Sequence, residues 1–139
     1  MEVQNPTTQL NPYLTFNGNC EEAINFYKSI LGGEIKQISK FGEGPMEVPE
    51  AKKGQIMHIH YEFEGCAILA SDGMGEEAAN FGNNIHLSVF LADKAAASST
   101  YQKLGDWGQT TMPFNEVFWG GSFGMLVDKF GIHWMVSCP

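Results

Sequence analysis

The same order of secondary-structure signals occurs twice along this chain, and this repetition constrains the fold more than any other feature. In each half, a β-type run leads into a helical pattern that ends at glycine, and three further β-type runs follow. Three positions match between the halves, each pair 73 residues apart: Leu14 with Leu87, Leu31 with Leu104, and Gly32 with Gly105. The sequence therefore predicts an α+β domain built from a duplicated β-α-β-β-β module.

Alternating apolar residues and turn signals set the expected boundaries of the two modules. The first module is predicted at residues 8–73, the linker at 74–83 and the second module at 84–139. Asn19 and Asp93 are the expected N-caps of the two helices, and Glu64-Gly65 is the expected turn of a hairpin within 55–72. The remaining strands are expected at 11–16, 34–41, 84–91, 109–114, 122–128 and 132–138. With 43% hydrophobic residues, the chain has enough apolar surface for a real core.

Charge and cysteine content limit the classes of function and the cellular compartment. The net charge is −8 and no basic stripe is present, so a nucleic-acid partner is not expected. The opening residues are polar and no apolar run resembles a membrane span, so neither a signal peptide nor a membrane partner is expected. The three cysteines are odd in number and lack C-x-x-C spacing, which is typical of a reduced, cytoplasmic compartment.

Strand alternation collects polar and aromatic side chains on the faces that point away from the helices. In "QIMHIHYEF" the residues expected to pack on the core are Met57, Ile59, Tyr61 and Phe63. The same reasoning applies to the other strands, and Trp119 is added because it precedes Gly120-Gly121 in an expected loop. The candidate ligand-binding residues are Tyr13, His58, His60, Glu62, His86, Ser88, Phe90, Trp119, His133 and Met135.

Three stretches of the chain carry a family resemblance. They are "NPYLTFNGNCEEAINFYKSILGGEI", "ASDGM" and "FWGGSFGMLVDKFGIHWMVS", and they resemble the PhnB-like branch of the vicinal oxygen chelate superfamily, which includes glyoxalases, bleomycin-resistance proteins and dioxygenases. The resemblance spans nearly the whole chain and implies two curved sheets around a cleft, usually completed by a homodimer. A homodimer and a small-molecule ligand are therefore the expected partners, and the candidate residues are expected to line the cleft. Some members of this branch carry a 3-demethylubiquinone methyltransferase label.

The resemblance also bears on metal binding. Members of the superfamily that use a metal take one ligand from each of four strands, and these positions fall near Asn11, Leu69, His86 and Met135. Only His86 is a ligand of the usual type, so the preferred prediction is a cleft without a metal or other cofactor. An H-x-H strand suits two imidazole ligands, however. The alternative is therefore a divalent metal held by His58, His60 and His86.

The preferred function is binding of a small molecule in a polar-aromatic cleft, without an assigned activity or catalytic residues. Sequestration of a drug-like or metabolic ligand is one form of this function. The alternative is a metal-dependent lyase, isomerase or dioxygenase that uses the cleft histidines, since one fold hosts many reactions. The stretch from Asp72 to Ala78 contains G-x-G-x-x-A, but no parallel βαβ unit follows, so no S-adenosylmethionine or dinucleotide site is predicted.

Overall fold

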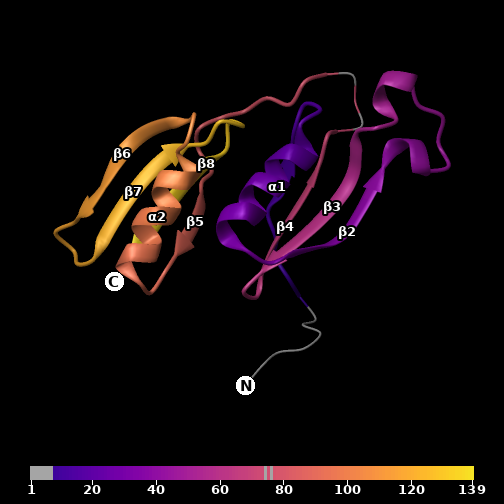
Figure 1. Cartoon of the computed structure of the whole chain (residues 1–139). Coiled ribbons are helices and arrows are strands. Elements are labelled where there is room, and N and C mark those ends of the chain that lie inside the picture. Colours follow the sequence, from indigo (N-terminus) through magenta and orange to yellow (C-terminus); the bar gives the residue numbers. More distant parts are fainter. Residues whose placement is uncertain (1–7, 74, 76) are drawn as a thin grey trace. The chain divides into compact units, whose positions relative to one another are not determined.

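A computed structural model describes residues 8–73, 75 and 77–139 of the chain (Figure 1). Residues 1–7, 74 and 76 lie outside the described residues, so part of the predicted 74–83 linker and of the G-x-G-x-x-A stretch is not described. The chain divides into two units. The first unit comprises Met1–Ile24 and Gly33–Ala78, and the second comprises Asn25–Gly32 and Ala79–Pro139. The boundary between the units therefore passes through the first helix.

The first unit contains a four-stranded mixed sheet. Its elements are β1 (Tyr13–Thr15), the beginning of α1 (Cys20–Leu31), β2 (Glu34–Lys40), β3 (Ile56–Phe63) and β4 (Cys66–Ser71). The strand order is β1-β4-β3-β2, in which β1 runs parallel to β4 and the other neighbours are antiparallel. Two short 3-10 helices, η1 (Phe41–Glu43) and η2 (Glu50–Lys52), lie in the connection from β2 to β3. The predicted hairpin turn is confirmed at Glu64 and Gly65, both with positive φ.

The second unit repeats this arrangement. Its elements are β5 (Leu87–Phe90), α2 (Lys94–Leu104), β6 (Gln109–Glu116), β7 (Ser122–Val127) and β8 (His133–Cys138). The strand order is β5-β8-β7-β6, again with one parallel pair, β5 with β8. Helix α2 packs on β7 and β8 (Figure 1). The repeated order of elements confirms the predicted α+β fold.

Local chemistry sets the start of α2 and the end of α1. The Asp93 carboxylate accepts a hydrogen bond from the backbone N of Ala96 at 2.9 Å, which confirms Asp93 as the N-cap of α2. Helix α1 ends at Gly32, whose φ of +79° is a left-handed conformation that glycine adopts without strain. Neither helix is long and apolar enough to cross a membrane, and the described residues contain no other candidate span.

Each unit contains one buried aspartate that binds several backbone or side-chain donors. In the first unit, Asp72 accepts hydrogen bonds from the backbone N of Gly18, Cys20 and Ile56, at 2.8 to 2.9 Å. These bonds tie the loop before α1 to the start of β3. In the second unit, Asp128 follows β7 and accepts from the Tyr27 hydroxyl at 2.6 Å and from the Trp134 indole N at 2.9 Å. A buried carboxylate with this many donors is fully satisfied, so both aspartates serve the fold.

The three cysteines are free thiols. Cys20 and Cys138 are buried, whereas Cys66 is exposed at the start of β4. Burial raises the pKa of the Cys20 thiol to about 12, and the nearby charges of Asp72 and Glu21 add to this effect. A thiol with so high a pKa is a poor nucleophile, so Cys20 belongs to the core.

Candidate functional site

Each sheet has one face packed into the core and one face that stays partly accessible, which we call its open face. The alternation is regular in β8, where Trp134 and Val136 are buried and His133, Met135 and Ser137 are half-buried. In β3, Ile59 and Tyr61 are buried, while His58 and His60 alternate with them on the open face. Burial raises the pKa of the Tyr61 hydroxyl to about 12.

On the open face of the first unit, a phenol meets an imidazole. The Tyr13 hydroxyl on β1 lies 3.0 Å from Nδ1 of His58 on β3, within hydrogen-bond distance. Their ring centroids are 5.7 Å apart. This contact crosses β4, the strand between β1 and β3. Since Tyr13 occupies Nδ1, the other ring nitrogen of His58, Nε2, is the one left for a ligand.

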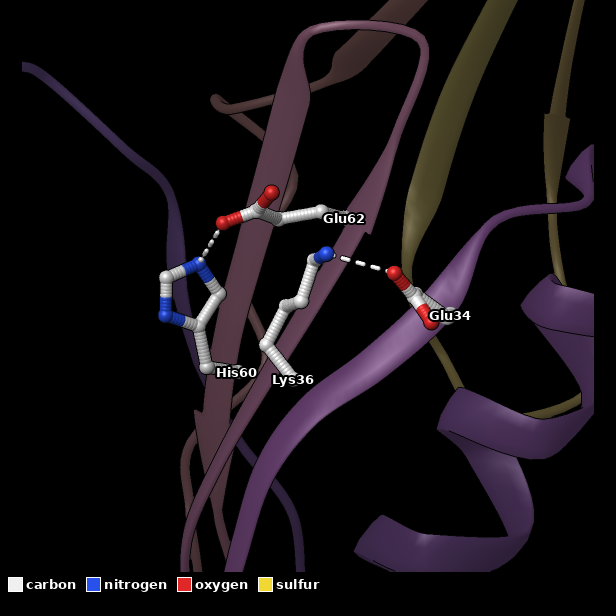
Figure 2. Close-up of polar contacts among 4 residues, drawn as sticks. All are labelled: Glu34, Lys36, His60 and Glu62. Atoms are coloured by element: carbon white, nitrogen blue, oxygen red, sulfur yellow. Dashed lines mark hydrogen bonds and ion pairs between the residues drawn. The ribbon is translucent and has the colours of Figure 1, made fainter.

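A carboxylate lies beside the second histidine of this strand. Nε2 of His60 is 2.8 Å from Oε2 of Glu62, and the two side chains are 30% and 43% exposed (Figure 2). The His60 nitrogen itself is buried, and its contact with Glu62 is an ion pair when the imidazole is protonated. On the neighbouring β2, Lys36 pairs with Glu34, and this hydrogen bond raises the pKa of Lys36 (Figure 2).

One detail of the predicted packing face is wrong at the start of β3. Met57 was expected in the core, but Ile56 is buried there and Met57 is only half-buried. The cause is an irregularity in the pairing of β2 with β3: Ser39 pairs with His58, but Lys40 pairs with Ile56. A bulge of this kind shifts the alternation by one residue. Ile59 and Tyr61 are buried as predicted, whereas Phe63 at the end of the strand is half-buried.

On the open face of the second unit, two histidines lie side by side. The ring centroids of His86 and His133 are 5.1 Å apart, with the planes at 75° in an edge-to-face contact. His86 directly precedes β5 and His133 begins β8, and these two strands are parallel neighbours. Further along the same pair of strands, Ser88 is paired with Met135.

Beyond this polar region, two aromatic side chains stand on either side of a serine. Phe90 on β5 pairs with Ser137 on β8, and Ser137 pairs with Phe123 on β7. Phe90 is 64% exposed. Trp119, in the loop between β6 and β7, is 61% exposed, and its ring lies 6.1 Å from that of Phe123. We call Phe90, Ser137, Phe123 and Trp119 the aromatic slot.

The structure distributes the ten candidate residues between the two units. Tyr13, His58, His60 and Glu62 lie on the open face of the first unit, and the other six lie on or beside the open face of the second. Phe123 and Ser137 were not among the candidates, although the alternation in "SFGMLV" and "HWMVSC" places both on the open face. His86 belongs to a different unit from His58 and His60, and its ring partner is His133. In the described ranges, no three His, Cys, Asp or Glu side chains gather as a metal-binding group.

A cavity of about 410 Å³ lies elsewhere in the second unit, among residues of α1, of α2 and of the turn after α2. Its lining residues are Phe26, Ser29, Ile30, Gln102, Lys103 and Asp106. None of the ten candidate residues takes part in it. The open face carries imidazoles and accessible aromatic rings, which are the groups that most often orient a small ligand, so we favour the open face on chemical grounds over the cavity.

The fold defines the class of protein. A glyoxalase-related enzyme from Fulvimarina pelagi shares it with a TM-score of 0.61 at 17% identity, over 94% of this chain and 88% of that one. A family model described as 3-demethylubiquinone-9 3-methyltransferase matches residues 8–137. The chain belongs to this family, a PhnB-like branch of the glyoxalase fold, as the sequence resemblance predicted.

Individual relatives agree with this assignment. Protein YjdN of Escherichia coli K12 is 30% identical over 92% of this chain and 93% of its own length. The structure of protein PA1353 from Pseudomonas aeruginosa has a TM-score of 0.88 at 36% identity, covering 95% of this chain and 98% of that one. A PhnB protein from Bacillus cereus has a TM-score of 0.81 at 27% identity, covering 95% and 100%.

Proposed function

We propose that the protein binds a small, flat organic molecule on the open face of the second unit. The observation that carries this proposal is the aromatic slot, in which Phe90 and Phe123 flank Ser137 across three neighbouring strands. Phe90 on β5 and Trp119 in the loop between β6 and β7 are both more than half exposed, so both rings are accessible to a ligand. Accessible aromatic side chains around a small floor residue are typical of a stacking site.

The spacing of the strands suits a single aromatic ring between the two phenylalanines. Neighbouring strands lie about 4.8 Å apart, so Phe90 and Phe123 start from backbones roughly 10 Å apart. A flat ring that contacts one aromatic ring on each side needs about 7–8 Å between those rings. Ser137 between them has a short side chain and leaves this space open.

Polar groups next to the slot define the chemistry of the ligand. Ser88 lies two residues before Phe90 on the same face of β5, and the His86–His133 pair lies one step further along. Hydroxyl and imidazole groups donate hydrogen bonds to carbonyl, hydroxyl or carboxylate oxygens. The ligand class is therefore an aromatic, heteroaromatic or quinone-like ring that carries such oxygens. The family description names a ubiquinone derivative, a ring of this kind, which supports the proposal.

The methyl-transfer activity in the family description has less support in this chain. A methyltransferase also needs a methyl donor such as S-adenosylmethionine. The parallel pairs in the described sheets, β1 with β4 and β5 with β8, are each joined through a helix and two strands. They do not form the βαβ unit that typically holds such a cofactor. We therefore propose ligand binding without a cofactor.

Tryptophan fluorescence tests the proposal with a matched pair of variants. The protein is titrated with a panel of aromatic acids, hydroxyquinolines and benzoquinones, and S-adenosylmethionine is added as a separate ligand. We expect members of the panel to quench the fluorescence of the wild type and of Trp107→Phe, since Trp107 is exposed in a different loop. The quenching should be lost in Trp119→Phe, because that variant lacks the fluorophore beside the slot.

A binding measurement that does not depend on fluorescence completes the test. By calorimetry, Phe90→Ala should weaken binding of the same compounds by about tenfold, since one stacking contact is worth 0.5–1.5 kcal/mol beyond its buried area. Equal affinity in Phe90→Ala and wild type would contradict the placement of the binding site at the aromatic slot. Binding of S-adenosylmethionine in place of the panel would favour the methyltransferase activity.

A second candidate function is a metal-dependent lyase, isomerase or dioxygenase that uses the histidines of the first unit, His58 and His60. One observation favours it: Glu62 lies 2.8 Å from His60, and histidine ligands of metals commonly have a carboxylate as an outer partner. Elemental analysis of the untagged protein decides this candidate. A divalent metal near one equivalent that is absent from His58→Ala/His60→Ala would support it, and absence of metal from both proteins after incubation with each ion would reject it.

The family resemblance extends the proposal to assembly and compartment. We propose a homodimer in the cytoplasm, with a small molecule as the partner rather than nucleic acid or membrane. The acidic charge of −8 and the exposed free thiol Cys66 support this setting. Light scattering on the purified protein gives the molar mass directly, and a mass of one chain would reject the dimer.

A further inference from the structure

The open face of the second unit carries a row of thioether side chains. Met135 on β8 pairs with Met125 on β7, which pairs with Met112 on β6. Residues that are paired across neighbouring strands project to the same side of a sheet. Met125 and Met135 are half-buried, and Met112 is more exposed. The core of the unit lies on the opposite face, so the packing of that core does not require this row.

The histidine pair lies directly beside this row. His133 and Met135 are two residues apart on β8, so their side chains share the open face about 7 Å apart along the strand. The His86 and His133 rings are in contact, with centroids 5.1 Å apart. Two imidazoles and two thioethers therefore belong to three adjacent strands within one unit.

The first unit shows that a long side chain at the equivalent position can reach across the middle strand of this face. His86 is the counterpart of Tyr13, 73 residues earlier, and the register of the sheets makes Met125 the counterpart of His58. In the first unit, the side chains at these two positions meet: the Tyr13 hydroxyl lies 3.0 Å from His58 Nδ1. The equivalent positions in the second unit hold His86 and Met125.

The chemistry of this group selects one kind of metal ion. Thioether sulfur is a soft ligand that prefers Cu(I), and imidazole also binds copper well. The residues paired across the strands with Met125, Met135 and His133 also include Ser88, Met112, Val127 and Gln109. None of these is a carboxylate suited to Mg²⁺ or Ca²⁺. We propose that His86, His133, Met125 and Met135 form a binding site for Cu(I). The site shares His86 and His133 with the polar region beside the aromatic slot, but it includes none of the four slot residues.

A competition titration tests the site in the full chain. The exposed thiol of Cys66 would itself bind Cu(I), so every protein carries Cys66→Ser. Cu(I) held by the coloured chelator bicinchoninate is titrated with protein under anaerobic, reducing conditions. We expect this background protein to withdraw one equivalent of Cu(I). Met125→Leu and Met135→Leu should each weaken the affinity by about tenfold or more, and the double variant by about a hundredfold.

The controls separate this site from adventitious binding. Met57→Leu removes a half-buried methionine from the first unit and should leave the affinity unchanged. Leu for Met conserves volume, so the variants should fold, which thermal unfolding verifies. Ag(I) should also shift the methyl signals of Met125 and Met135 in the NMR spectrum of the background protein. Equal affinity in the double variant and Met57→Leu, or no Cu(I) withdrawn by any protein, would overturn the proposal.

Discussion

Single buried polar residues fix the second unit, and Asp128 is the clearest case. Its carboxylate accepts hydrogen bonds from the Tyr27 hydroxyl, the Trp134 indole and the backbone N of Phe130 and Ile132. Tyr27 also contacts the rings of Phe130 and Trp134 edge to face. This one residue therefore joins the second half of α1, the turn after β7 and the start of β8.

Tyr27→Phe tests how much this hydrogen-bond network contributes to the free energy of unfolding. The substitution removes one short hydrogen bond to a charged group and keeps the aromatic packing, so we expect a loss of about 1.5–3 kcal/mol in the free energy of unfolding. Tyr101→Phe is the matched control, because the Tyr101 hydroxyl donates to neutral carbonyls of Met112 and Met125. Its cost should be about 0.5–1.5 kcal/mol. Urea unfolding measures both, and an equal or smaller loss in Tyr27→Phe would contradict the role given to Asp128.

Tyr61 makes the stability of the protein depend on pH in the alkaline range. Burial raises its pKa from 10.0 to about 12, so the unfolded chain loses the hydroxyl proton at lower pH than the folded chain does. Stability is therefore fully present below pH 10 and falls as the pH rises toward 12. Tyr61→Phe should show a shallower fall over this window in urea unfolding. A fall as steep as that of the wild type would show that Tyr61 does not cause it.

At the scale of elements, the turn between α1 and β2 depends on two adjacent glycines with different surroundings. Both Gly32 and Gly33 have positive φ, +79° and +81°. A Cβ at Gly32 would meet nothing within 4 Å, whereas a Cβ at Gly33 would overlap the carbonyl oxygen of Glu62. Gly33 is therefore required by space as well as by backbone conformation, and its position sets how closely the start of β2 approaches β3.

Alanine substitutions at Gly32 and Gly33 separate the requirement for a positive φ from the requirement for space. Gly32→Ala should cost about 1–2 kcal/mol, the price of a left-handed conformation for an L-residue. Gly33→Ala should cost at least about 3 kcal/mol, because the overlap with Glu62 is added and the strand must shift. Thermal or urea unfolding of the two variants gives the comparison. Equal losses would mean that the backbone moves freely at Gly33.

The elements were predictable from the sequence to the extent that their signals are local. The helix ends at Gly32 and Gly105, the Asp93 cap and the alternation in β8 all depend on neighbouring residues, and each is confirmed. The burial of Ile56 in the core, where Met57 was expected, was not predictable. It arises from the pairing of Ile56 with Lys40 on another strand. The same limit applies to the aromatic slot, which depends on the register that sets Phe90, Ser137 and Phe123 side by side.

At the scale of the whole molecule, the two units of the duplication share the same order of strands and helix but carry different side chains on their open faces. Tyr13 and His58 in the first unit correspond to His86 and Met125 in the second. The core faces stay apolar in both, since the fold requires this. The open faces differ because packing does not constrain them. A duplicated scaffold permits this divergence, because one fold can carry different side chains on its accessible surface.

Chemical-shift mapping of the amide signals with a quenching compound tests the central claim most directly. We expect the shifts to concentrate in β5, β7 and β8 around Phe90, Phe123 and Ser137, and we expect Phe90→Ala to need about ten times more of the compound to reach the same shifts. Shifts concentrated instead around Phe26 and Lys103, at the cavity among the helix residues, would contradict the proposed site.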